Sequence, residues 1–202
     1  MKLVQDYTKP IKVPLDGVCS SYKDRIPPLE GELDKVLITA ECLKKRIVAL
    51  ANEIAKDFKE IYAIVVLEGA KYFFNDLEKL LKERGLNVCY DEIKLSSYSK
   101  KESSGEVIIK KDIKADLLDK DVLIVEDIVD TGLTLNFLKD YLLNKKYVRD
   151  VKICALLDKP ARRKVEIKLD YVGFIIPNEF VVGYGIDYEA HYRELPYIAC
   201  IK

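Results

Sequence analysis

Residues 122–134 of this chain read VLIVEDIVDTGLT, and this stretch determines the expected fold class. The four apolar residues from Val122 to Val125 are typical of a strand that is covered on both faces of a sheet. Two acids follow, and a Thr-Gly turn then leads into a helix predicted over about residues 133–143. A buried strand, a glycine turn and a helix in this order indicate an α/β protein with a parallel sheet.

The turn has the composition of an anion-binding site. Gly132 lets the backbone approach a ligand where a Cβ would intrude, and N–H groups at a helix start bind anions. The hydroxyls of Thr131 and Thr134 add donors. Glu126 and Asp127 would repel phosphate, so we expect them to bind sugar hydroxyls or a divalent cation. The plainer alternative, a buried strand whose acids cap the next helix, explains fewer of these features.

Strands and helices alternate through the rest of the chain. The apolar spacing predicts helices over 39–58 and 72–84. Buried or short strands are predicted at 61–67, 88–95, 107–109, 151–157, 171–176 and 180–183. Residues 1–36 are expected to form an irregular arm and residues from 186 onward an irregular polar segment. We therefore predict one domain with a mainly parallel twisted sheet, helices on both faces and active groups at the carboxyl ends of the strands.

Composition excludes several classes of function. Lysine plus arginine and aspartate plus glutamate both total 34, so nucleic acid is not an expected partner. No signal peptide and no apolar run of about 18 residues is present, which predicts a cytoplasmic protein without membrane contact. Five cysteines without C-x-x-C spacing indicate reduced thiols. His191, the single histidine, is expected at the surface.

The segment from Glu126 to Thr134 resembles the 5-phosphoribosyl-1-pyrophosphate (PRPP) signature of the type I phosphoribosyltransferases. From about residue 63 onward the chain also resembles the hypoxanthine-guanine phosphoribosyltransferases of that family. The likeness rests on LEGAKYFF at 67–74, SY at 97–98, LLDK at 156–159, FVVGYGIDY at 180–188 and the following Arg193. It implies the type I phosphoribosyltransferase fold, with a core over about 37–158. It also implies a small hood subdomain from the N-terminal arm and the C-terminal segment, about 159–202, which binds the purine.

The resemblance also implies roles for the signature residues. Two acids, Glu126 and Asp127, would bind the ribose hydroxyls, and the turn at 130–134 would bind the 5-phosphate. Asp130 would be the catalytic acid that handles the proton on purine N7. The full set implied for PRPP or nucleotide binding is Glu126, Asp127, Ile128, Val129, Asp130, Thr131, Gly132, Leu133 and Thr134.

Purine binding is implied for Lys159 at O6 and Phe180 as a stacking partner, with backbone oxygens of Val181 and Asp187 at the base edge. Mg²⁺ is the implied cofactor, held by Asp187 with Glu126 and Asp127. Taken alone, Lys159 would be read as a surface lysine and Phe180 as core packing. Asp187 and Arg193 alone would be read as a surface ion pair.

Pyrophosphate binding is implied for Leu67, Glu68, Gly69 and Arg193, with a non-proline cis peptide in the 67–69 turn. Glu68 departs from the family, where this position is commonly basic. We expect its carboxylate to turn outward or to pair with Lys71. Residues 96–105 have little apolar content and predict a mobile loop that closes over the reactants, with Ser97 and Tyr98 as its contacts.

The expected reaction is transfer of the 5-phosphoribosyl group from PRPP to N9 of hypoxanthine or guanine, which gives IMP or GMP and pyrophosphate in purine salvage. A homodimer or homotetramer is expected. Two alternatives stay open at this point: a phosphoribosyltransferase for xanthine or adenine, and a PRPP-sensing regulator without catalysis. The lysine at position 159 argues against adenine, because the 6-amino group of adenine is also a donor. The neutral charge and short arm argue against a nucleic-acid-binding regulator.

Overall fold

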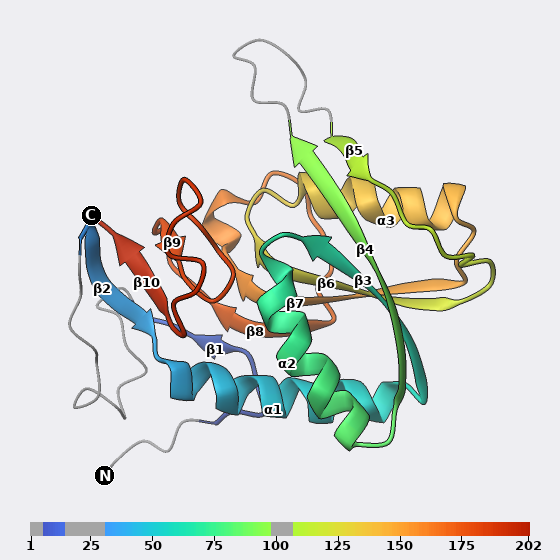
Figure 1. Cartoon of the computed structure of the whole chain (residues 1–202), viewed down its shortest axis with the longest axis horizontal. Helices are drawn as coiled ribbons and strands as arrows, with labels where there is room; N and C mark the ends of the chain where they lie inside the picture. The colour runs from blue at the N-terminus through green and yellow to red at the C-terminus, as the bar shows by residue number, and fades with distance from the viewer. Residues whose placement is uncertain (1–5, 15–30, 98–106) are drawn as a thin grey trace.

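The computed structural model describes residues 6–14, 31–97 and 107–202 (Figure 1). Its main element is a seven-stranded sheet with the strand order β1-β8-β7-β6-β3-β4-β5. The strands are β1 (Ile11–Lys12), β3 (Glu60–Leu67), β4 (Asn87–Ser97), β5 (Val107–Lys111), β6 (Asp121–Val129), β7 (Asp150–Asp158) and β8 (Tyr171–Ile175). All neighbouring pairs are parallel except β4 and β5, so the predicted mainly parallel sheet is confirmed.

Helices cover both faces of this sheet. α1 (Ala40–Asp57) begins after Thr39, whose hydroxyl accepts a hydrogen bond from the N–H of Cys42 at 3.3 Å. α2 (Ala70–Glu83) connects β3 to β4, and α3 (Leu133–Lys145) connects β6 to β7. Figure 1 shows α1 and α2 on one face of the sheet and α3 on the other. Within the described residues, no helix is long and apolar enough to cross a membrane.

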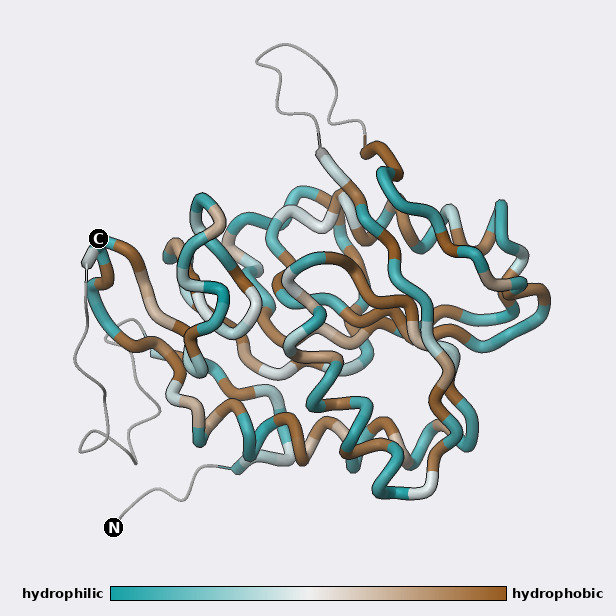
Figure 2. The backbone as a smooth tube through the Cα atoms, in the orientation of Figure 1, coloured by the Kyte–Doolittle hydropathy of each residue, from teal (hydrophilic) through white to brown (hydrophobic). Residues whose placement is uncertain are grey.

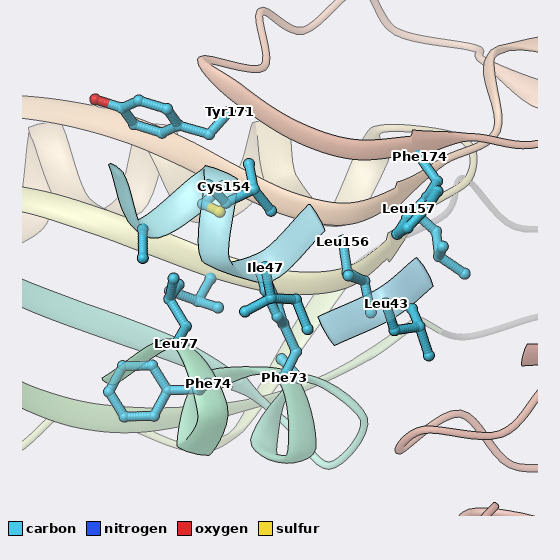
Figure 3. Packing of buried hydrophobic residues seen from close by; sticks show 14 of the residues in the cluster. Leu43, Ile47, Phe73, Phe74, Leu77, Cys154, Leu156, Leu157, Tyr171 and Phe174 are labelled. Carbon is cyan, nitrogen blue, oxygen red and sulfur yellow. The ribbon is translucent and has the colours of Figure 1, made fainter. Parts of the chain in front are cut away.

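The apolar core lies on both sides of the central strands. Along β3, Ile61 and Val65 pack into the cluster with α1 and α2, whereas Ile64 packs into the cluster with α3. Successive side chains of a strand point to opposite faces, so a continuous apolar run serves both clusters. Figure 2 shows these central strands as largely brown, hydrophobic segments. Figure 3 shows the first cluster, in which Leu43 of α1 and Phe73 of α2 lie beside residues of β7 and β8.

A second, three-stranded antiparallel sheet joins the two ends of the chain. It has the order β2-β10-β9, with β2 (Leu33–Ile38), β9 (Val181–Val182) and β10 (Ile198–Ile201). This sheet agrees with the hood expected from the N-terminal arm and the C-terminal segment. The exact boundaries of arm, core and hood stay a prediction.

Two expectations for irregular structure were wrong. The arm at 1–36 contains β1 and the start of β2, and the segment after residue 186 contains β10. These strands have two to six residues and pair with partners far away in sequence, as Ile11 pairs with Phe174 and Leu33 with Ile201. Such short segments show too little alternation to be recognised locally. Two further expectations agree with the structure: His191 is exposed, and the four cysteines among the described residues are free.

Candidate active site

The signature lies at the carboxyl end of β6, where the chain turns into α3. Gly132 precedes the helix with a φ of +83°, a left-handed conformation that glycine adopts without steric cost. A Cβ at this position would lie 2.7 Å from the carbonyl oxygen of Val165. Backbone conformation and close packing therefore both require glycine here.

A cavity of about 190 Å³ opens beside this turn, and we call it the phosphate cavity. It is lined by Val66, Leu95, Glu126, Ile128, Val129, Asp130, Thr131, Gly132, Thr134 and Leu135. Seven of the nine predicted PRPP-binding residues are in this set. Of the other two, Leu133 is the first residue of α3 and Asp127 lines a neighbouring cavity. Because unpaired N–H groups cluster at a helix start, this cavity is suited to an anion.

Two adjacent acids lie where the phosphate cavity meets its neighbour, with Glu126 lining both cavities and Asp127 only the neighbouring one. Glu126 is buried, and its Oε1 accepts a hydrogen bond from the N–H of Asp127 at 3.2 Å. Asp127 in turn accepts from the N–H of Ile128 at 2.7 Å. Burial and the negative charge of Asp127 raise the pKa of Glu126 well above its usual value, and burial also raises the pKa of Asp127. Hydroxyl donors or a cation would relieve this repulsion.

The Glu126→Gln variant should be more stable than the wild type at neutral pH. The pKa of Glu126 is above its ordinary value of 4.5, so the folded state holds the proton more tightly than the unfolded state. Stability is therefore lost as the pH rises from 4.5 toward the raised pKa, and glutamine avoids this loss. We expect a gain of about 1 kcal/mol, or roughly 2–4 °C in Tm. Calorimetry at pH 5 and pH 7.5 checks this, and an equal difference at both values would contradict it.

A second cavity of about 260 Å³ opens at the carboxyl end of β3, and we call it the pyrophosphate cavity. It is lined by Val66, Leu67, Glu68, Gly69, Glu126, Asp127, Ile186, Asp187 and Arg193. All four predicted pyrophosphate residues meet here, together with the three predicted metal ligands. The peptide between Leu67 and Glu68 is cis, as the family resemblance implied.

Glycines allow three segments to meet at this cavity. A Cβ on Gly69 would lie 1.6 Å from Oδ2 of Asp127. A Cβ on Gly185 would lie 2.1 Å from the carbonyl oxygen of Gly69. The end of β3, the acid pair and the C-terminal segment are thus in direct contact, which brings Asp187 and Arg193 to the sheet edge.

Arg193 provides the positive charge of the pyrophosphate cavity. Its Nη2 lies 2.6 Å from Oδ1 of Asp187, and its Nη1 donates to the carbonyl oxygen of Gly185 at 3.3 Å. The charge of Arg193 also opposes the rise in the pKa of Asp127. The two residues do form a partly exposed ion pair, as they would be read alone, and both also line the pyrophosphate cavity.

Glu68 pairs with a different lysine from the one expected. Its Oε1 lies 2.7 Å from Nζ of Lys94, whereas Lys71 pairs with Glu92 at 3.3 Å. The hydrogen bond from Lys94 lowers the pKa of Glu68 below its usual value. Lys94 offsets much of the repulsion that Glu68 would exert on a bound anion.

Three of the predicted purine residues line neither cavity, and their side chains differ in how far they are exposed. Lys159 follows β7 and is only 5% exposed, and desolvation lowers its pKa against the opposing charge of Asp130. Phe180 is 55% exposed, with its ring edge-on to Tyr188 at a centroid distance of 5.5 Å. Val181 is buried in β9. The readings of Lys159 as a surface lysine and Phe180 as core are therefore both wrong.

Asp130 has a buried oxygen that is free of hydrogen bonds within the described part of the chain. This Oδ1 lies 3.3 Å from Nε of Arg162, close enough for an ion pair. The guanidinium of Arg163 reaches the backbone of Asp130 instead, with Nε donating to the carbonyl oxygen at 3.1 Å. Sequence reasoning missed both arginines. Their position two and three residues after Pro160, close to the predicted purine-binding Lys159, was the available signal.

The predicted loop lies mostly outside the described residues, whereas the predicted metal ligands lie within them. Ser97 ends β4, and Tyr98 lies outside the described residues, so the loop contacts stay predictions. Across residues 6–14, 31–97 and 107–202, no three acidic, histidine or cysteine side chains are grouped to hold a metal. The carboxylates of the pyrophosphate cavity nevertheless suit Mg²⁺, which commonly takes one or two protein carboxylates and completes its shell with phosphate oxygens and water.

Comparisons with known proteins agree with this geometry. The family model described as phosphoribosyl transferase domain matches residues 38–189. The hypoxanthine-guanine phosphoribosyltransferase of Bacillus subtilis is 42% identical over 177 residues, covering 86% of this chain and 96% of the relative. A crystal structure of a hypoxanthine-guanine phosphoribosyltransferase from Bacillus anthracis matches with a TM-score of 0.78 at 44% identity, covering 85% of this chain and all of that one.

The chain spans only part of a longer relative. The bifunctional protein TilS/HprT of Listeria monocytogenes is 45% identical over 177 residues, and the chain spans 27% of its length. The family match covers most of the chain, and the Bacillus subtilis relative is matched over nearly its full length. The chain therefore belongs to the phosphoribosyl transferase family, within the group of the hypoxanthine-guanine phosphoribosyltransferases.

Proposed function

We propose that this chain is a purine-salvage enzyme. It transfers the 5-phosphoribosyl group from PRPP to N9 of hypoxanthine or guanine and gives IMP or GMP and pyrophosphate. The main support is the meeting of the phosphate cavity and the pyrophosphate cavity at one acid pair, the buried Glu126 and the half-buried Asp127. PRPP has a phosphate at one end, a pyrophosphate at the other and ribose hydroxyls between, and this order matches the order of the sites.

The acid pair and the turn at residues 130–134, which we call the phosphate turn, would hold the two sides of the ribose 5-phosphate. Breaking the bond at C1 of the ribose develops oxocarbenium character, as in glycoside chemistry. The N–H groups and hydroxyls of residues 130–134 would anchor the 5-phosphate, while Glu126 and Asp127 accept hydrogen bonds from the ribose hydroxyls. Fixing the ring at both points positions C1 for attack by the base and removes much of the entropic barrier.

The pyrophosphate cavity would receive the leaving group. Arg193 and the backbone of the 67–69 turn bind its oxygens, and Lys94 offsets the charge of Glu68. Asp187, Glu126 and Asp127 would hold magnesium there, which when bound neutralises pyrophosphate charge. The loop closure predicted from the sequence of residues 96–105 falls mostly on residues outside the described part of the chain.

The purine would lie between the hood and the end of β7. Lys159 donates to O6, Phe180 stacks on the ring, and the backbone oxygens of Val181 and Asp187 accept from the base edge. Asp130 takes the proton at N7 as N9 attacks. The exposed ring of Phe180 supports the stacking role, because a side chain already packed in the core could not receive a base.

Replacing Lys159 by alanine should weaken hypoxanthine and guanine and spare PRPP. A lost hydrogen bond to a charged donor raises KM for both bases about 10- to 100-fold. Adenine should be inert with the wild type, because a buried donor facing a 6-amino group stays unpaired. Steady-state assays with each base check this. Lys168→Ala, which removes an exposed lysine on the same connection, is the matched control. Comparable adenine turnover in the wild type would contradict the proposed base specificity.

We further propose that the enzyme works in the cytoplasm as a homodimer or homotetramer. The family resemblance supports the assembly, and the lack of a membrane-spanning helix among the described residues is compatible with the location.

A further inference from the structure

The segment 159–165 runs back along the phosphate turn after β7 ends. We call it the clamp segment. It begins with Lys159, passes through the short 3₁₀ turn Pro160–Arg162, and ends beside Gly132 at Val165. No part of it was expected to act on the phosphate site. Its hydrogen bonds are directed to three consecutive carbonyl groups at the point where β6 ends and the phosphate turn begins.

The three carbonyls belong to Val129, Asp130 and Thr131. The first accepts from the N–H of Lys159 at 3.0 Å and from Nη2 of Arg163 at 3.3 Å. The second accepts from Nε of Arg163 at 3.1 Å. The third accepts from the N–H groups of residues 164 and 165 at 2.9 and 3.2 Å. All three carbonyl groups are therefore held on the side of the clamp segment.

This arrangement sets the direction of the opposite N–H groups. A peptide unit is planar and trans, so its C=O and its N–H point in opposite directions. Holding the carbonyls of Asp130 and Thr131 against the clamp segment turns the N–H groups of Thr131 and Gly132 away from it. Both residues line the phosphate cavity, so these donors are directed toward the place of the anion.

Arg163 makes the side-chain part of this clamp. Its side chain is 18% exposed, and its guanidinium forms an ion pair with Asp158 at the end of β7. The same Nη2 that pairs with Asp158 also donates to the carbonyl oxygen of Val129, and Nε donates to that of Asp130. Its Cδ also lies 3.0 Å from the place of a Cβ on Gly132, so the two residues pack closely. The rigid fork of arginine can bridge these three acceptors, whereas a single ammonium nitrogen cannot.

We propose that Arg163 is a positioning residue that preorganises the backbone N–H groups for the 5-phosphate. This inference rests on the proposed function for the identity of the anion. In this proposal Arg163 does not contact the substrate itself. Because the clamp segment starts at Lys159, the same backbone also connects the purine site to the phosphate site.

The test compares two ligands that occupy different cavities. Ribose 5-phosphate reports on the phosphate cavity, and pyrophosphate with magnesium reports on the pyrophosphate cavity. In Arg163→Gln we expect the Kd for ribose 5-phosphate, measured by calorimetry, to rise about 10- to 100-fold, as for loss of a charge-assisted hydrogen bond. The Kd for pyrophosphate should stay near the wild-type value. Arg149→Gln is the matched control, since Arg149 is an exposed arginine in a two-bond pair with Asp121.

Arg163→Lys separates geometry from charge. It keeps the positive charge but cannot bridge the three acceptors, so it should weaken ribose 5-phosphate nearly as much as glutamine does. Full recovery in the lysine variant would overturn the proposal in favour of simple attraction. Equal weakening of both ligands in Arg163→Gln, or no weakening of either, would also overturn it. The assay needs no purine base, so a wild type that binds ribose 5-phosphate but transfers to no purine would refute the proposed function alone.

Discussion

Turnover should fall by about 10² to 10⁴ in the Asp130→Asn variant, the range typical of a lost general acid or base. Asparagine has nearly the same shape but cannot accept the N7 proton. The backbone of Asp130 is held by Arg163 independently of the side chain, so the phosphate cavity should keep its form. We therefore expect the Kd for PRPP to change little. Steady-state kinetics with hypoxanthine, together with direct measurement of PRPP binding, check this expectation.

A matched control separates this effect from a general loss of charge. Asp112→Asn removes an exposed carboxylate that pairs with Lys146 and lies outside both cavities, so its turnover should equal that of the wild type. If Asp130→Asn lost PRPP binding and turnover to the same extent, Asp130 would be a structural residue of the turn. The proton-transfer role would then be wrong.

Excess chelator should abolish turnover, and added magnesium should restore it. The leaving pyrophosphate carries several negative charges, and the pyrophosphate cavity already contains Glu68, Glu126, Asp127 and Asp187 against Arg193. Without a divalent cation this balance is unfavourable to the anion. Activity measured across a magnesium titration checks the expectation, and full turnover in excess chelator would refute it.

The described carboxylates form no ready metal cluster, so the cation should arrive with the substrate. Calorimetry should therefore detect weak binding of magnesium to the free protein and stronger binding in the presence of PRPP. Equal affinity in both conditions would point to a metal site built by the protein alone. An Asp187→Asn variant should raise the magnesium concentration needed for half-maximal activity.

Much of the fold and most of the candidate site could be predicted from the sequence. The strand at 121–129, the turn at Gly132 and the helix from Leu133 follow from patterns within a few residues, because strand alternation, helix periodicity and glycine turns are local properties. The acids at 126 and 127 could be assigned to the ribose or to a cation because their type excludes phosphate binding. The family resemblance supplied the purine and pyrophosphate residues, which have no local pattern of their own.

The tertiary structure decided the features that join distant segments. Glu68 pairs with Lys94 of the neighbouring strand, because parallel pairing places Leu67 beside Lys94 and so brings the next residue within reach. Arg46 of α1 is fully buried and donates to carbonyl oxygens of residues 172 and 173. Its counter-ion Glu53 lies in the same helix, but these two carbonyl acceptors lie more than a hundred residues away, which no local pattern contains.

Arg163 illustrates the same limit within the site. The sequence determined that a glycine turn with free N–H groups follows β6, because those groups are a property of any helix start. Only the path of the 159–165 segment decided that its arginine would hold the carbonyl of Asp130, some thirty residues earlier. The composition of the anion site is thus local, whereas the direction of its donors depends on hydrogen bonds between segments that meet only in the folded chain.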